Sequence, residues 1–161
     1  MLAQAIKRRL SKEENQKGFT LIELLAVIVI LGVIAVIAVP MIGNVITSAK
    51  KDSDIATARQ IYDAARLYVV GEKGGVFAET NGLTITIGPK ATTGTLQNKG
   101  YLESPIYWPS TKEEIKEGTV VFDAEGKLVS VTVKPASSAA SDADGKFTPE
   151  QILKGKKEDG K

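Results

Sequence analysis

The chain has 161 residues but contains no cysteine and no histidine, and both absences narrow what it can do. Without thiol and imidazole groups it cannot form a disulfide, a Cys₂His₂ zinc site, a cysteine nucleophile or a histidine-based acid–base centre. Its charges nearly balance, with 21 lysines and arginines against 19 aspartates and glutamates. The chain therefore lacks the overall basic field that favours nucleic acids, and a folded domain in it must depend on core packing.

Charged residues are nearly absent from one long stretch. Glu23 is the only charged residue between Gly18 and Gly43. About 20 apolar residues in a helix span the hydrocarbon core of a bilayer, where a carboxylate costs about 3 kcal/mol. The run is too long for the apolar part of a secretory signal, and the basic residues before it predict a cytoplasmic N-terminus. We therefore expect a single-pass membrane helix in which Glu23 either has a partner or reaches the lipid headgroups.

The sequence KGFTLIE, from Lys17 to Glu23, and the apolar run after it resemble the N-terminal signature of type IV prepilins and pseudopilins. The resemblance implies that a prepilin peptidase cleaves between Gly18 and Phe19 on the cytoplasmic side, and that Phe19 becomes N-methylated. It also implies that Glu23, the fifth residue of the cleaved chain, faces the N-terminal amine of a neighbouring subunit. Such a pair would set the register of one helix against the next.

Two residues inside the apolar run weaken a helix. Gly32 is a poor helix former, and Pro40 removes one backbone hydrogen bond. In similar pilins the segment between such positions kinks or loses helicity on assembly, and the sequence permits either behaviour here.

Beyond Gly43 the pattern predicts the second half of a long helix and then a small sheet. Ile55, Ala58, Tyr62, Ala65 and Val69 recur at spacings of three and four, which is typical of one face of a helix. The segments LTITI (83–87), TVVFD (119–123) and LVSVTVK (128–134) alternate as strands do, and the last two flank a turn that contains a glycine. We therefore predict an α+β fold in which the long N-terminal helix packs on a small antiparallel sheet.

The expected organisation has five parts. They are a basic, cleaved leader (1–18), a transmembrane or filament-core helix (19–43), the amphipathic soluble half of that helix (44–71), a β-rich globular head (72–134) and a flexible tail with room for a short helix (135–161). Within the head we expect one short helix around 95–99 and another after a capping box formed by Ser110 and Glu113. Gly100-Tyr101-Leu102 followed by a proline resembles the heads of Gram-positive pilin-like proteins.

Two further motifs have both a structural and a functional interpretation. Tyr101, Tyr107 and Trp108 could stack on single-stranded nucleic acid, but only two lysines lie near them in the sequence, so core packing is the better interpretation. Asp142 and Asp144 fit positions three and five of a calcium loop, whose first and twelfth positions would then hold Ala140 and Gln151 instead of carboxylates. A turn before a short helix capped by Thr148 and Pro149 explains this segment better, and we expect no metal and no cofactor.

The function favoured by the resemblance is that of a structural subunit of a type IV pilus. The partners it implies are other copies of the chain, which form a helical filament through the N-terminal helix, the prepilin peptidase, a membrane assembly platform and minor pilins. The expected location is the membrane before assembly and the cell-surface pilus afterwards. One alternative is a pseudopilin of a type II secretion or competence DNA-uptake apparatus, although nothing indicates DNA binding. An enzyme on a membrane anchor is a third hypothesis, but the carboxylates, lysines and serines show no spacing typical of an active site.

Overall fold

A computed structural model describes residues 18–155 of the chain. The predicted leader (residues 1–17) and the charged end of the predicted tail (156–161) lie outside the described residues. The elements are α2 (Leu21–Glu72), β1 (Leu83–Ile87), β2 (Glu117–Phe122), β3 (Leu128–Lys134), β4 (Lys146–Phe147) and α3 (Pro149–Lys154). The chain divides within α2 into two compact units, of which the second begins at Val45. We call residues 45–155 the head unit.

The first unit is a helical segment that stays α-helical through both weakening residues. Gly32 and Pro40 have helical backbones, although Pro40 cannot donate to the carbonyl four residues earlier. No part of its most apolar window is buried, and the helix is long and apolar enough to cross a membrane. Leucine, isoleucine and valine dominate this segment, as expected for a helix whose surface lies in lipid or against other helices.

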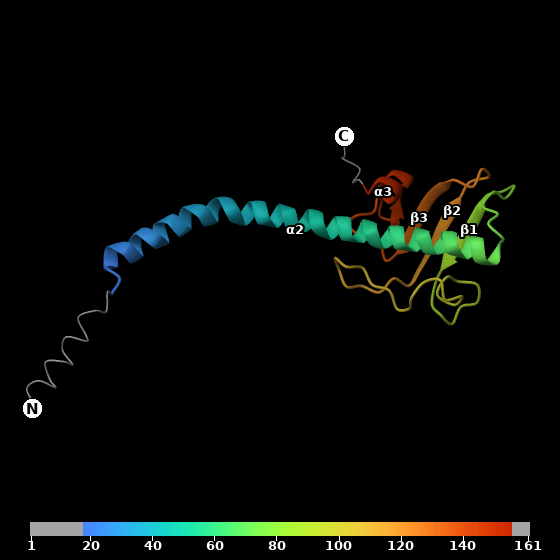
Figure 1. The fold of residues 1–161 in the computed structure, drawn as a ribbon, viewed down its shortest axis with the longest axis horizontal. Helices are drawn as coiled ribbons and strands as arrows, with labels where there is room; N and C mark the ends of the chain where they lie inside the picture. The colour runs from blue at the N-terminus through green and yellow to red at the C-terminus, as the bar shows by residue number, and fades with distance from the viewer. Residues whose placement is uncertain (1–17, 156–161) are drawn as a thin grey trace, which may run out of the picture. The chain divides into compact units, whose positions relative to one another are not determined.

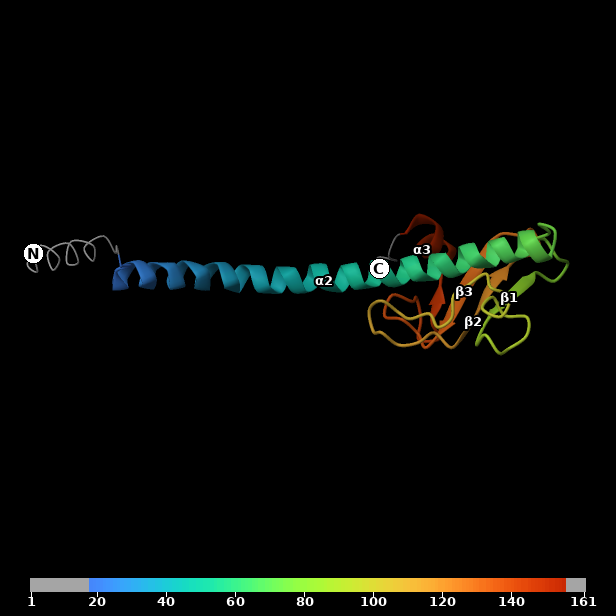
Figure 2. The ribbon, with the colours of Figure 1, turned by 60° about the horizontal axis from the view of Figure 1, so that its bottom comes forward.

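In the head unit, the second half of α2 lies along the sheet, as Figures 1 and 2 both show. Ile55, Ala58, Ile61, Ala65 and Val69 are 3% exposed or less and form the helix side of the core. The predicted apolar face is thus confirmed, except that Ile61 is fully buried while its neighbour Tyr62 is half-buried and meets the ring of Phe122 at 6.1 Å. These residues give the helix the tertiary support that a stretch of mixed polarity needs.

The sheet has the strand order β1-β2-β3-β4, and all neighbouring strands are antiparallel. Its inner face carries Leu83, Ile85 and Ile87 from β1, which alternate with exposed threonines as the sequence predicted. The β2–β3 turn has Gly126 at φ 79°, a backbone conformation that favours glycine. The long N-terminal helix on a four-stranded antiparallel sheet confirms the predicted α+β fold.

Three local predictions differ from the structure. Residues 95–99 form turns in place of a helix, with a single helical hydrogen bond from the Lys99 N–H to the Thr95 carbonyl (3.0 Å). The helix expected after Ser110 is absent, because the Ser110 side chain bonds to α2 and Glu114 forms an isolated β-bridge with Tyr107.

The third difference concerns the segment that we expected to be a flexible linker. Residues 135–148 pack against the rest of the head unit, where Ser137, Ala139 and Gly145 are buried and Phe147 of β4 is fully buried. The short helix expected after this segment is present as α3. Its capping box joins Thr148 to Gln151, and Pro149 stands in its first turn.

Candidate assembly site

The N-terminus of α2 is closed by a capping box that involves the lone charge of the apolar run. The Thr20 N–H and hydroxyl both donate to Oε2 of Glu23 at 2.8 Å, and the Glu23 N–H donates to the Thr20 hydroxyl at 3.3 Å. The carboxylate therefore satisfies donors that the helix end leaves free, and its negative charge faces the positive end of the helix dipole. The T-x-x-E spacing could have revealed this box, but the sequence analysis assigned a capping box to Ser110 and Glu113 instead.

One oxygen of this carboxylate keeps its capacity for a further bond. Both Thr20 donors reach Oε2, whereas Oε1 of Glu23 accepts no hydrogen bond within residues 18–155. An ionised carboxylate can accept several hydrogen bonds. The helix N-terminus thus has a fixed carboxylate with one side open to another donor.

The predicted cleavage site lies just before the helix. Gly18, Phe19 and Thr20 are exposed and not helical, and α2 begins at Leu21. The Phe19 side chain is 84% exposed. The peptide bond between Gly18 and Phe19 is therefore in accessible, irregular backbone, which a peptidase can bind without first unwinding a helix.

The helix surface that follows is uncovered. Large apolar side chains are at least half exposed at nearly every turn between Leu21 and Ile46. The exposed fraction is 67% or more for six of them: Leu21, Ile22, Val36, Ile37, Val39 and Met41. Exposed apolar surface on this scale marks a membrane or protein contact. The sequence predicted this surface, and the structure assigns it no cover within the described residues.

A buried polar cluster in the head unit escaped the sequence analysis. Asp54 of α2 is fully buried, and its carboxylate accepts hydrogen bonds from the Ser110 N–H (3.1 Å), the Ser110 hydroxyl (2.6 Å) and the Ser137 hydroxyl. No cation pairs with it among the described residues. Because the three residues are far apart in the sequence, no local pattern indicates the cluster. In the sequence, Asp54 looks like any other polar residue of an amphipathic helix.

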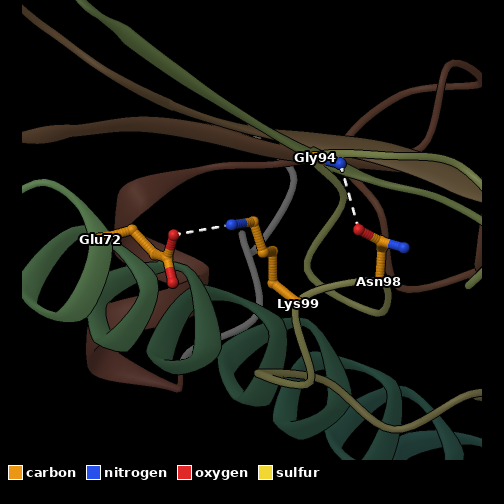
Figure 3. Close-up of polar contacts among 4 residues, drawn as sticks. All are labelled: Glu72, Gly94, Asn98 and Lys99. Atoms are coloured by element: carbon orange, nitrogen blue, oxygen red, sulfur yellow. Dashed lines mark hydrogen bonds and ion pairs between the residues drawn. The ribbon is translucent and has the colours of Figure 1, made fainter.

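A second contact fixes the loop after β1 to the end of α2. Lys99 Nζ lies 2.7 Å from Oε2 of Glu72, and the Gly94 N–H donates to the Asn98 side chain in the same loop (Figure 3). The hydrogen bond to Glu72 raises the pKa of Lys99. The pair is partly exposed, so it orients the loop more than it stabilises the fold.

The aromatic residues singled out in the sequence do not form one surface. Trp108 is fully buried, and its indole N–H donates to the Pro135 carbonyl (2.7 Å). Tyr101 is half-buried with its ring 5.5 Å from that of Tyr68, and only Tyr107 is exposed. The packing interpretation is therefore confirmed for Trp108 and Tyr101 but not for Tyr107, and the three rings do not form one stacking surface.

The calcium-loop candidate has its ligand atoms engaged elsewhere. Oδ1 of Asp142 accepts the N–H groups of Asp144 (3.1 Å) and Lys146 (3.0 Å), which is typical of a turn. Gln151, at the twelfth position, is buried, and its side chain belongs to the α3 capping box. Among residues 18–155, no group of three or more acidic side chains is placed to hold a metal ion.

Comparison with known proteins settles the family. The model of the prokaryotic N-terminal methylation motif matches residues 15–39. A type IV major fimbrial protein FimA of Dichelobacter nodosus is 31% identical over 147 residues, which cover 83% of this chain and 94% of the relative. The chain belongs to the type IV pilin family. A second FimA protein of the same organism is 28% identical over 149 residues with the same coverage, and no solved structure matches.

Membership in this family tells us the class of protein and agrees with the exposed apolar helix. This pilin is a structural protein and not an enzyme, and its exposed apolar helix agrees with a location in a membrane or a pilus. The matched motif covers Phe19, Glu23 and Gly32. Neither relative supports the Gram-positive type that we expected, so that part of the expectation stays a prediction.

Proposed function

We propose that this pilin is inserted in the membrane as a prepilin with its N-terminus in the cytoplasm. A prepilin peptidase cleaves it after Gly18, Phe19 becomes N-methylated, and residues 19–43 then form the core of an extracellular type IV pilus. A membrane assembly platform and minor pilins are the further partners. The names of the two relatives favour a pilus over a pseudopilus of a secretion or DNA-uptake apparatus.

The observation that carries this proposal is the uncovered apolar surface of α2 between Leu21 and Ile46. Each fully exposed large aliphatic side chain costs about 2 kcal/mol in water, so this surface must be covered. Lipid can cover it before assembly, and the helices of neighbouring copies can cover it afterwards. Because both environments are apolar, transfer from the membrane to the filament has a small net cost, and helix–helix packing can drive it.

Glu23 is proposed to pair with the Phe19 amine of a neighbouring copy. Cleavage creates this positive amine, which is costly to bury alone. The open Oε1 of Glu23 supports the pairing, since a neighbour's amine can bond there without breaking the bonds of Thr20 to Oε2. Within one chain, the geometry that caps the helix is thus compatible with a role between chains.

The proposal is tested by expressing the full chain with and without an active prepilin peptidase. We expect the membrane fraction from the first culture to contain a chain that starts at Phe19, with an intact mass that includes one added methyl group. The culture without peptidase should retain residues 1–18. An uncleaved chain beside a peptidase that processes a known prepilin would refute the proposed pathway and leave a plain membrane anchor.

Assembly type is tested in the same cells by electron microscopy. Long surface filaments that react with antibody to this chain are expected for a pilus subunit. Correct cleavage with only short periplasmic fibres would favour the pseudopilin alternative.

A further inference from the structure

The loop after β1 lines a cavity in the head unit. The cavity has a volume of about 710 Å³, within the usual range for small-molecule sites. Its lining includes both polar and apolar side chains, among them Lys90, Gln97, Leu102, Glu103, Ser104 and Pro105. All belong to the head unit and to one segment of 16 residues, 90–105.

Gln97 supplies the most informative polar group in this cavity. The residue is 4% exposed, and its Oε1 accepts the Gly88 N–H at 3.0 Å. That bond fixes which end of the amide is the nitrogen, since only the oxygen can accept. The Nε2 group donates a hydrogen bond to no atom within residues 18–155. Among these residues, every fully buried side-chain nitrogen has a hydrogen-bond partner, so Nε2 is not one of the fully buried nitrogens. Nε2 therefore keeps some access to solvent, and Gln97 is one of the residues that line the cavity.

A nearly buried amide with unused donors is costly unless something accepts from it. Water can do so when the cavity is empty, and a ligand oxygen can do so when it is filled. Two more side chains of the lining can bind a ligand: the Glu103 carboxylate can accept hydrogen bonds, and the Ser104 hydroxyl can donate and accept them. Neither side chain has a hydrogen-bond partner among the described residues.

The walls of the cavity are held in place by the chain itself. Asn98 donates to the Lys90 carbonyl (2.9 Å). Figure 3 shows two further contacts, in which Asn98 accepts from the Gly94 N–H and Lys99 pairs with Glu72 of α2. These contacts brace the loop from two sides. A site whose walls are already ordered loses less entropy when it binds a ligand.

The charge pattern selects the class of ligand. Lys99 is paired with Glu72, and the two other charged side chains of the lining, Lys90 and Glu103, have opposite signs. Their charges sum to zero, which gives no preference for a polyanion. A ring that carries hydroxyl groups fits better, because each hydroxyl both donates to a carboxylate and accepts from an amide. Its C–H face can lie on the exposed ring of Pro105. We propose that this cavity binds a neutral carbohydrate.

The test uses the full cleaved chain in micelles of a phosphocholine detergent, which has no sugar headgroup. Saturation-transfer NMR is recorded with glucose, galactose and N-acetylglucosamine, and dissociation constants are obtained by titration. We expect transfer to at least one of these sugars. Absence of transfer to all three, or transfer only to acidic sugars added as a comparison, would overturn the proposal.

Two variants test whether the sugar binds in this cavity. Gln97→Glu keeps the acceptor for Gly88 but removes the free donor, and Glu103→Gln removes the carboxylate at an exposed position that the fold does not need. Each is expected to weaken sugar binding about tenfold. The control Glu113→Gln changes an exposed carboxylate elsewhere on the head unit and should leave binding unchanged. Equal binding by Glu103→Gln and by the control would refute the site even if Gln97→Glu fails to fold.

Discussion

At the scale of single residues, Asp54 shows how a buried charge can organise a small head. Its carboxylate joins α2 to two segments, around Ser110 and around Ser137, that lie far from it in the sequence. A buried carboxylate without a cation is tolerated only when several donors satisfy it. The cluster therefore specifies where both segments lie against the helix, since any other arrangement would leave the charge unsatisfied.

Replacement of this carboxylate should be costly. We expect Asp54→Ala to lower the free energy of unfolding by about 3 kcal/mol, because it removes hydrogen bonds to a charged group and leaves buried donors without a partner. The measurement is denaturant unfolding of the full chain in detergent, followed by near-ultraviolet circular dichroism of the buried Trp108.

Asp52 provides the matched control for this variant, since it lies on the exposed side of the same helix. Asp52→Ala should change the free energy of unfolding by less than about 0.5 kcal/mol. Similar values for the two variants would show that the Asp54 cluster does not stabilise the head unit.

At the scale of elements, the two halves of α2 differ in their surroundings. Residues 21–44 of α2 are rich in leucine, isoleucine and valine and bury nothing within the described chain, whereas the second half is amphipathic and depends on the sheet. The segment after β3 shows a comparable dependence on context. It has the composition of a linker, yet Gly145 and Phe147 fix it to the sheet edge.

Gly145 tests how tightly this segment is packed. It has φ 78°, and a Cβ there would overlap the carbonyl oxygen of Val133, to whose N–H the Gly145 carbonyl is bonded (3.0 Å). Gly145→Ala should therefore lower the free energy of unfolding by about 3 kcal/mol, from the left-handed backbone and the steric overlap together.

Gly94 separates these two causes. It has a similar φ of 85°, but a Cβ there would meet nothing within 4 Å. Gly94→Ala should cost only about 1 kcal/mol, the conformational part. The free energy of unfolding of both variants is measured by thermal or denaturant unfolding. An equal decrease in the two variants would contradict the packing of residues 135–148 described above.

At the scale of the whole molecule, the pilin divides its tasks between two units. The first provides a long apolar surface with one carboxylate, and the second provides a folded head with its own buried core. Because the apolar surface has to be covered in both of its proposed environments, it does not by itself select one neighbour over another, and we propose that Glu23, the one charged residue between Gly18 and Gly43, provides this selection.

The negative charge of Glu23 and its role in the capping box can be tested separately by substitution. Glu23→Gln keeps a side chain that can complete the capping box with Thr20 but loses the negative charge. We expect normal cleavage but at least about a tenfold loss of filaments, as measured by shearing and immunoblotting, because the Phe19 amine of the neighbour would be buried without a counter-ion.

Thr20→Ala makes the opposite change, since it removes the cap and retains the charge. It should reduce helix stability by about 1 kcal/mol and still permit filaments. Filaments from Glu23→Gln at the normal level would refute the pairing and leave Glu23 with a capping role only.

Local sequence patterns predicted the features that depend on near neighbours. The apolar run, the amphipathic spacing from Ile55 to Val69, the strand alternation and the hairpin all follow from side chains a few residues apart. The Thr20–Glu23 box also follows from such spacing, although it was not recognised, and the box assigned to Ser110 was wrong because Ser110 bonds to Asp54 instead.

The long helix, the sheet and the apolar surface of α2 could thus be predicted from local patterns in the sequence. Contacts between distant segments were needed to show that Asp54 is buried, that residues 135–148 are packed, and that the nearly buried Gln97 lines a cavity. The physical reason is the range of the contacts. A periodic pattern records which side of one element is apolar, whereas the burial of a polar group depends on which distant segments meet there and whether they satisfy its hydrogen bonds.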